Sequence, residues 1–266
     1  MRKKIIECAK SMGLDCIGFT HAAPYNEQTG EHFQTAVVVL APYYAGEKEN
    51  SNLARYAWAE DYHVIVRDLL ERLAREIGLE RYAVCCDTGP QIDRLLAINA
   101  GLVFRGKNGM CIHPQYGSWL VIGYLVCDLD LPHDRPLGED CIGCGKCVAA
   151  CPGGAITPNG VDANRCLSAI TQKKGELPED EAVLVGKQGM AFGCDVCQNV
   201  CPHNVGVPLT PIGAFRQNLK CRVEMQEIAP LSNRAFSRTY QNRAWAWRGK
   251  GVIERNLGYI GAQKGK

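Results

Sequence analysis

Eight cysteines fall into two runs whose spacing suits iron–sulfur chemistry. The first run, Cys141–Cys151, has the pattern C-x2-C-x2-C-x3-C and is followed by Pro152. This is the ligand spacing found around [4Fe–4S] clusters. The second run, Cys194–Cys201, has the pattern C-x2-C-x3-C and is followed by Pro202. It holds one cysteine fewer, and Cys166 upstream can supply the missing ligand.

The two runs are expected to share their ligands. In two-cluster proteins the fourth cysteine of such a run binds the neighbouring cluster. This rule predicts two [4Fe–4S] clusters, each with four thiolate ligands. The first quartet is Cys141, Cys144, Cys147 and Cys201. The second quartet is Cys166, Cys194, Cys197 and Cys151. Two neighbouring clusters indicate that single electrons pass through the protein.

Zinc and disulfides are the alternative uses of so many cysteines. A zinc site usually joins two separated C-x2-C pairs in one tetrahedron, whereas eight ligands and two Cys-Pro pairs favour clusters. Disulfides are typical of small secreted domains, and this chain has 266 residues and no expected secretory leader. The other cysteines are expected to be reduced and mostly buried: Cys8, Cys16, Cys85, Cys86, Cys111, Cys127 and Cys221.

A carboxylate that could move a proton follows a predicted strand. Asp87 begins the segment Asp87-Thr88-Gly89-Pro90, between the end of that strand and the start of a predicted helix. Ligands of open α/β sheets bind beyond the carboxyl ends of strands. A carboxyl group shielded there by an apolar cofactor would have a raised pKa and could act as a general acid. The alternative is a helix N-cap, which the tetrapeptide alone favours.

Four other polar residues allow the same two interpretations: an ordinary surface or structural role, or a role in function. They are Asp61, His63, Asp93 and Arg94. Asp61 and His63 also form the first half of the cobalamin motif Asp-x-His-x-x-Gly, but the glycine is absent. Spacing alone therefore does not demonstrate a cobalamin site. The chain contains no Walker A loop and no G-x-G-x-x-G after a strand, so nucleotide binding is unsupported.

The elements that must position these residues alternate between strands and helices in the first half of the chain. We expect strands at 15–20, 36–41, 82–87 and 118–126 and helices at 1–12, 53–77 and 90–101. Residues 21–35 read as a polar loop, 128–140 as a linker, and 233–240 and 252–262 as helices. This order predicts an α/β (α+β) core. The expected domains are a catalytic domain at 1–130, a ferredoxin-like domain at 131–210 and a basic C-terminal helical extension, packed on the core, at 211–266.

The charge of the chain is unevenly spread. Residues 205–266 carry eleven Lys/Arg against three Asp/Glu, a local charge of +8, although the whole chain has a net charge of +2. A basic segment beside a redox module suggests a polyanionic partner, and Tyr240, Trp245 and Trp247 among its arginines favour nucleic acid. No apolar run is long enough to span a bilayer, so we expect a cytoplasmic protein without a membrane partner.

Taken together, the motifs resemble epoxyqueuosine reductases, the cobalamin- and iron–sulfur-dependent enzymes of queuosine biosynthesis in tRNA. The resemblance covers nearly the whole chain, and its segments occur in the family's order. These segments are Ser11–Thr20, Trp58–His63, Asp87–Pro90, Asp93-Arg94, Gly101–Asn108, Pro114–Ser118, Arg165–Thr171, Phe192–Gln198, Trp247–Lys250 and Arg255-Asn256.

The resemblance implies a fold, two kinds of cofactor and a reaction. The fold would be a cobalamin-binding core related to reductive dehalogenases and nitroreductases, with a dicluster ferredoxin-like domain packed on it. The clusters would pass electrons to cobalamin, which would reduce the epoxide of epoxyqueuosine to the alkene of queuosine. Asp87 matches the family's proton donor. Asp61, His63, Asp93 and Arg94 match positions that line the cofactor and substrate cavity.

The resemblance also implies partners and leaves alternatives. The expected partners are tRNA, held by residues 205–266, and an electron donor such as flavodoxin or ferredoxin. Family members commonly continue into C-terminal helical repeats that grip tRNA, and we expect a short form without them. One alternative is a reductive dehalogenase-like enzyme acting on a small molecule. The other is a ferredoxin-type electron carrier, which would need neither cobalamin nor Asp87.

Overall fold

A four-stranded antiparallel sheet forms the centre of the first half of the chain. The computed structural model describes residues 1–264. The strands are β1 (Cys16–His21), β2 (Thr35–Pro42), β6 (Leu120–Cys127) and β3 (Tyr82–Cys86), in the spatial order β1-β2-β6-β3. Every neighbouring pair in this sheet is antiparallel. The core is therefore α+β, and Asp87 follows β3 without lying at the edge of a parallel sheet.

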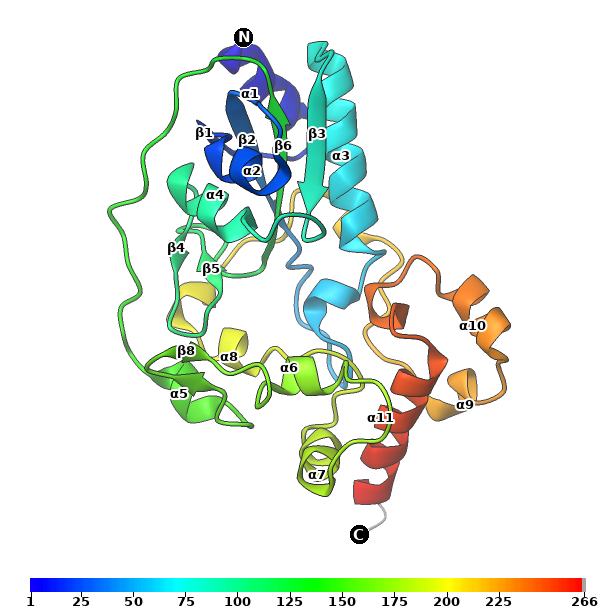
Figure 1. Cartoon of the computed structure of the whole chain (residues 1–266). Helices are drawn as coiled ribbons and strands as arrows, with labels where there is room; N and C mark the ends of the chain where they lie inside the picture. The colour runs from blue at the N-terminus through cyan, green and yellow to red at the C-terminus, as the bar shows by residue number, and fades with distance from the viewer. Residues whose placement is uncertain (265–266) are drawn as a thin grey trace.

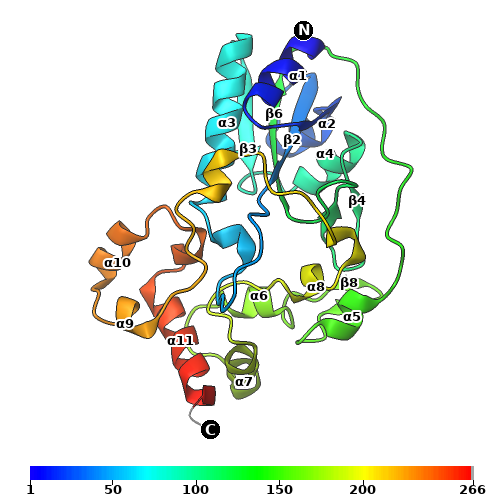
Figure 2. The ribbon, with the colours of Figure 1, turned by 180° about the vertical axis from the view of Figure 1, so that it is seen from behind.

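Helices cover both faces of the sheet because alternate residues of each strand point to opposite sides. Val37, Val39 and Ala41 pack in the hydrophobic cluster of α1 (Arg2–Ser11) and α3 (Tyr62–Ile77). On the opposite face, side chains of β2 pack with α2 (Ala23–Thr29) and α4 (Asp93–Asn99). Figure 1 shows α2 and α4 in front of the sheet, and α1 comes to the front in the reversed view of Figure 2. Burial on both faces explains why β2 is apolar throughout.

Three predicted element boundaries are wrong for local reasons. The helix expected from residue 53 begins at Tyr62, because the Asp61 carboxylate caps it by accepting the His63 backbone N–H at 3.0 Å. The preceding residues include only the short 3-10 helix η1 (Arg55–Ala57). The helix expected from residue 90 begins at Asp93. The polar segment expected to be a loop contains α2, whose polar composition masked it.

The remaining elements are short and surround the cysteine runs. They are β4 (Phe104–Arg105), β5 (Cys111–Ile112), α5 (Lys146–Ala150), β7 (Ile156–Thr157), β8 (Gly160–Val161), α6 (Leu167–Ile170), α7 (Glu179–Gln188), α8 (Val196–Asn199) and η2 (Pro202–Asn204). The C-terminal elements are η3 (Gly213–Arg216), α9 (Met225–Ile228), α10 (Asn233–Thr239), η4 (Ala244–Ala246) and α11 (Lys250–Lys264). Residues 128–145 form no helix or strand and run outside the sheet as a long connection (Figure 1).

The C-terminal elements share a hydrophobic core with two earlier segments. Trp245 and Ile253 are buried together with Leu53 and Trp58, and with Phe192 from the cysteine-rich region. Helix α11 also packs against α7. The expected use of Trp245 for nucleic acid is therefore wrong, because its side chain is fully buried. None of the helices in the described part of the chain is both long and apolar enough to cross a lipid bilayer.

Candidate active site and cluster sites

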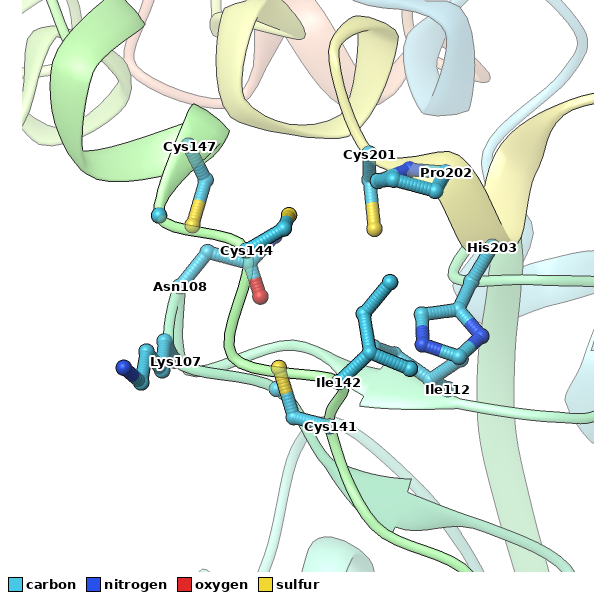
Figure 3. A pocket seen from close by; sticks show the side chains of 12 residues that line it. Lys107, Asn108, Ile112, Cys141, Ile142, Cys144, Cys147, Cys201, Pro202 and His203 are labelled. Atoms are coloured by element: carbon cyan, nitrogen blue, oxygen red, sulfur yellow. The ribbon is translucent and has the colours of Figure 1, made fainter.

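The first quartet lies around one hollow. Cys141, Cys144 and Cys147 come from the loop before α5 and from α5 itself, and Cys201 comes from the turn after α8. Helices α5 and α8 pack against each other, which brings these distant parts of the chain together. Figure 3 shows the four sulfur atoms facing a common space. The structure thus gathers the set that the sequence rule assigned to one cluster.

The second quartet lies between α6 and α8. Cys166 precedes α6, Cys197 lies in α8, and Cys194 precedes it. Burial, and after it the charges of the nearby Cys194, Cys166 and Cys151, raise the pKa of the Cys197 thiol to about 12. The backbone N–H of Ala155 donates to Cys151 Sγ at 3.2 Å. Clustered thiolates need a cationic partner, and N–H···S bonds stabilise cluster sulfur ligands, so this donor set fits a [4Fe–4S] cluster.

The spacing of the ligands argues against a mononuclear site. Within residues 1–264, no three His, Cys, Asp or Glu side chains lie close enough to hold one metal ion. The first quartet instead surrounds a hollow that is also lined by Ile142, Ile112 and His203 (Figure 3). An inorganic cluster bridges a wider gap between thiolates than a single zinc ion does. Apolar lining also controls solvent access to the cluster.

Asp87 lies at the apex of a tight turn. The Thr88 backbone N–H donates to the Cys86 carbonyl oxygen at 2.6 Å, and Asp87 has φ +56°. Such a positive φ is unusual for a residue with a side chain, although aspartate tolerates it better than most. Asp87 caps no helix, since the N-cap of α4 is Ile92. Its side chain is 62% exposed, so the turn presents the carboxylate outward.

A histidine lies between two carboxylates at this site. His63 Nδ1 is 2.7 Å from Asp61 Oδ1, and His63 Nε2 is 3.5 Å from Asp87 Oδ2. Hydrogen bonds to Asp61 and then Asp87 raise the pKa of His63 to about 9. The hydrogen bond from His63 lowers the pKa of Asp87 below its usual range. These contacts favour a proton on His63 at neutral pH, and the rise expected for the Asp87 pKa under a shielding cofactor stays a prediction.

Asp93 and Arg94 lie beside Asp87 at the start of α4. Burial raises the pKa of the Asp93 carboxyl, although backbone N–H groups of Asp93 and Asp87 oppose the rise. Among the described residues, Asp93 Oδ1 is buried without a hydrogen-bond partner. The positive charge of Arg94 contributes to the low pKa of Asp87. An unpaired buried acceptor is costly, so Asp93 Oδ1 is suited to receive an N–H donor from a bound molecule.

Two tyrosines that sequence reasoning missed complete the site. The Tyr62 hydroxyl donates to Asp87 Oδ2 at 2.5 Å, and its ring stacks on His63 with centroids 4.1 Å apart. Tyr56 packs edge-on against Tyr62 with centroids 6.0 Å apart. Tyr62 stood inside the quoted segment Trp58–His63, but an aromatic residue at a helix start is typical of a core position. No pattern in the sequence indicated Tyr56.

Tyr56 connects the Asp87 site with the second quartet. Burial raises the pKa of the Tyr56 hydroxyl, and the charges of Asp87 and Cys166 raise it too, whereas the nearby Ser168 side chain lowers it. Ser168 lies in α6, directly after Cys166. The second quartet therefore lies next to the carboxylate site. The first quartet, by contrast, includes the exposed Cys144.

Two family models match the chain. One, described as a 4Fe-4S double cluster binding domain, matches residues 140–204, which contain both quartets. The prediction of two [4Fe–4S] clusters is therefore confirmed. The other, described as epoxyqueuosine reductase QueG, DUF1730, matches residues 26–88. That range includes Asp61, His63 and Asp87.

Curated relatives carry the same description. The epoxyqueuosine reductase of Lactococcus garvieae is 37% identical over 223 residues, which are 80% of this chain and 62% of the relative. The epoxyqueuosine reductase of Staphylococcus aureus is 30% identical over 299 residues, covering 96% of this chain and 78% of the relative. The chain thus spans less than two thirds of the first relative and more than three quarters of the second.

Solved structures agree in fold. A crystal structure of epoxyqueuosine reductase with an epoxyqueuosine-modified tRNA-Tyr stem loop matches with a TM-score of 0.87 at 29% identity, covering 98% of this chain and 81% of that chain. The Bacillus subtilis enzyme, with its catalytic aspartate loop swung out of the active site, matches with 0.85 at 28% identity over the same shares. A catabolic reductive dehalogenase matches with 0.53 at 16% identity, covering 98% of this chain and 35% of that chain. The last match shows a shared fold, and the predicted fold class is confirmed.

Proposed function

The chain belongs to the epoxyqueuosine reductase family, and on that premise we propose that it reduces the epoxide of epoxyqueuosine in tRNA to the alkene of queuosine. The observation that carries this proposal is the hydrogen-bonded group of Asp61, His63 and Asp87 beside the second quartet. Removal of an epoxide oxygen as water takes two electrons and two protons. A site that joins an electron path to a proton donor suits this reaction.

The cofactors are two [4Fe–4S] clusters and cobalamin. The quartets hold the clusters, and Asp61, His63, Asp93 and Arg94 line the side of the cavity that receives cobalamin and substrate. When bound, cobalamin supplies the two-electron reduction of the epoxide. The buried, unpaired Asp93 Oδ1 fits a corrin ring, whose peripheral amides can donate to it. Asp93 then lies against the Asp87 turn, whose backbone N–H lowers the Asp93 pKa.

The chain's own residues hold and deliver the proton. His63 keeps a proton at neutral pH because two carboxylates stabilise its charge. Asp87 Oδ2 receives that proton and passes it to the epoxide oxygen as the general acid. The second proton that water requires follows by the same path after solvent has reprotonated His63. The Tyr62 hydroxyl donates to the same oxygen and holds the carboxylate in place between transfers. Asp87 has a low pKa, but the proton stored on His63 lies close to it. Asp87 can therefore still deliver a proton to the epoxide oxygen at neutral pH.

Electrons enter at the first quartet, where Cys144 is exposed, and leave at the second quartet, whose cysteines are all half-buried. Around the first quartet Cys144 is exposed, Ile142 is 62% exposed and Val148 is 43% exposed. An apolar rim of this kind suits a transient redox partner, and we assign it to a donor such as flavodoxin or ferredoxin. From there electrons pass to the second quartet and then to the Asp87 site by way of the region around Tyr56.

The substrate end of the molecule is basic. Residues 205–266 carry the local charge of +8 and would hold the phosphates of a tRNA stem loop. This assigns residues 1–130 to catalysis, 131–210 to electron transfer and 211–266 to substrate contact. The place of action is then the cytoplasm, where tRNA is available.

An anaerobic conversion assay tests the proposal. The protein is purified with reconstituted clusters, supplied with cobalamin and a strong reductant, and given tRNA that carries epoxyqueuosine. The tRNA is then digested, and its nucleosides are separated and identified by mass spectrometry. Appearance of queuosine supports the proposal. If both clusters are intact and cobalamin is bound but no queuosine forms, the substrate is a different molecule.

A further inference from the structure

Trp247 is exposed in a way that the fold does not require. Its side chain is 57% exposed, and it is the only exposed Trp, Tyr or Phe in the part of the chain that the structure describes. Its neighbour Trp245 is buried, with Phe236 and Tyr240 packed against it. Exposed large apolar side chains often mark interaction sites. Trp247 therefore needs an explanation that packing does not provide.

The indole of Trp247 is held in one orientation. Its Nε1–H donates to Gln172 Oε1 at 3.0 Å. The Arg248 guanidinium lies over the ring, with its central carbon 3.7 Å from the centroid. An arginine plane stacked on a tryptophan is a favourable arrangement. The pair thus forms a fixed, flat and positively charged surface that retains considerable exposure to solvent.

This surface adjoins the wall of the Asp87 site. Gln172 Nε2 donates to the Ser168 carbonyl oxygen at 3.0 Å. The Ser168 side chain lies near the hydroxyl of Tyr56, whose ring packs on Tyr62. The same C-terminal segment also contacts the site directly, since the Asp61 backbone N–H donates to the Asn242 carbonyl oxygen at 2.9 Å. A molecule that reaches Asp87 with one residue can therefore reach Trp247 with another.

The charges around Trp247 favour an anionic partner. Lys174 and Arg248 are exposed, and none of the carboxylates described in the structure lies within ion-pair distance of either. The neighbouring Lys173 is paired with Glu181 and Lys250 with Glu254. Uncompensated cations beside an exposed aromatic plane are the combination that binds single-stranded nucleic acid.

We propose that Trp247 and Arg248 form a stacking platform for an unpaired base of the tRNA anticodon loop, next to the nucleotide that enters the Asp87 site. This inference rests on the proposed function and names how the substrate is held. Unpaired loop bases are commonly recognised by stacking on aromatic rings and arginine planes. The platform would hold the loop open while the modified base turns toward Asp87, and Lys174 would contact the backbone phosphate.

The test compares Trp247→Ala with Trp247→Phe on a stem-loop RNA that carries epoxyqueuosine. Loss of stacking is expected to weaken RNA binding by about tenfold in Trp247→Ala, whereas Trp247→Phe keeps an aromatic plane and stays within about threefold of the parent. The alanine variant should raise KM far more than it lowers kcat. Leu209→Ala is the control, because Leu209 is another exposed apolar side chain, at 53% exposure.

A second measurement uses the unaltered protein. A stem loop with 5-iodouridine next to the modified position is bound and irradiated, and the crosslinked peptide is identified by mass spectrometry. The expected crosslink lies in the peptide that contains Trp247. Equal RNA affinity of Trp247→Ala and the parent, or a crosslink elsewhere, overturns the platform. The platform is also overturned if Trp247→Ala binds cobalamin more weakly but keeps the RNA affinity of the parent.

These outcomes separate the platform from the reaction itself. If the parent protein makes no queuosine, the proposed function fails, whatever the variants do. If the parent makes queuosine and Trp247→Ala keeps its KM, only the platform fails. Arg248→Ala and Arg248→Lys provide a further pair, since lysine keeps the charge but loses the stacking plane.

Discussion

The two cysteine quartets have nearly the same ligands and very different surroundings. The first quartet is bordered by exposed Cys144 and Ile142. The second lies beside Tyr56 and the Asp87 site, and burial raises the thiol pKa of Cys194 to about 11. Local spacing decides that each set can hold a cluster. From these surroundings we propose that the first cluster meets a partner protein and that the second serves the chemistry.

The largest expected effect comes from removing a ligand of the second quartet, the one beside the Asp87 site. Cys197→Ala should abolish queuosine formation and lower the iron content from about eight to about four atoms per chain. Iron analysis and electron paramagnetic resonance measure the loss. Cys8→Ala is the control, since Cys8 lies on α1 away from both quartets. Normal turnover with only one cluster would remove the second quartet from the electron path.

Cys144→Ala should impair electron entry at the first quartet, and its effect should be more selective than that of Cys197→Ala. Turnover with a protein donor is expected to stop, because that donor meets the first quartet. A small chemical reductant can reach the second cluster directly and should keep part of the activity. The two rates are measured on the same preparation. Equal loss with both reductants would show that electrons do not depend on an exposed point of entry.

Asp87→Asn should lower turnover by about 10²–10⁴-fold while both clusters remain. The amide keeps the shape of the side chain but cannot deliver a proton. Single-turnover rates measure the loss of turnover, and the cluster absorbance shows whether both clusters remain. Asp68→Asn is the control, because Asp68 is an exposed carboxylate on α3. A nearly silent Asp87→Asn would favour the electron-carrier alternative.

His63→Gln should lower turnover by about tenfold at neutral pH and remove a pH-dependent contribution to stability. The folded pKa of His63, about 9, exceeds its ordinary value of 6.5. The contribution is therefore complete below about pH 6.5 and disappears as pH rises through about 9. It should amount to about 1 kcal/mol, because the side chain is partly exposed. Denaturant unfolding of both proteins from pH 6 to about pH 10 measures it, and parallel curves would contradict it.

The smallest expected effect concerns the apolar rim of the first quartet. Ile142→Glu should slow turnover with flavodoxin by about three- to tenfold, because like charges hinder encounter with an acidic donor. The rate with a chemical reductant should not change. Leu209→Glu is the matched control at another exposed position. Equal slowing by both variants would mean that net charge, and not the rim, controls the rate.

The predicted element bounds were correct to within two residues where apolar periodicity was strong. They were wrong where a single side-chain contact sets the boundary. Strands β2 and β6 were expected within two residues of their ends, since both are buried on two faces. Helix α3 was predicted nine residues too early, because Asp61 begins it through a hydrogen bond that no periodicity reports. The start of a capped helix depends on a single side-chain contact. Apolar periodicity reflects many residues together and does not detect such a contact.

The residues of the candidate site were named from the sequence, but the contacts that set their pKa values were not. Asp61, His63 and Asp87 were all named from the sequence, and their contacts in the folded chain lower the pKa of Asp87. The reason is His63, which lies on α3 and approaches Asp87 after β3 only in the folded chain. Tyr62 was overlooked for the same reason, because its hydroxyl meets Asp87 through space.

By itself, the sequence determined the chemistry that depends on residue type and local spacing. The thiolate runs specified two [4Fe–4S] clusters, and the ordered segments specified the family. The tertiary structure alone decided which residues act on one another. It placed the second quartet next to Tyr56, held the proton on His63 and buried Trp245 while leaving Trp247 exposed. Solvent access and charge–charge distance are properties of the folded chain, and they control pKa values, electron entry and partner contact.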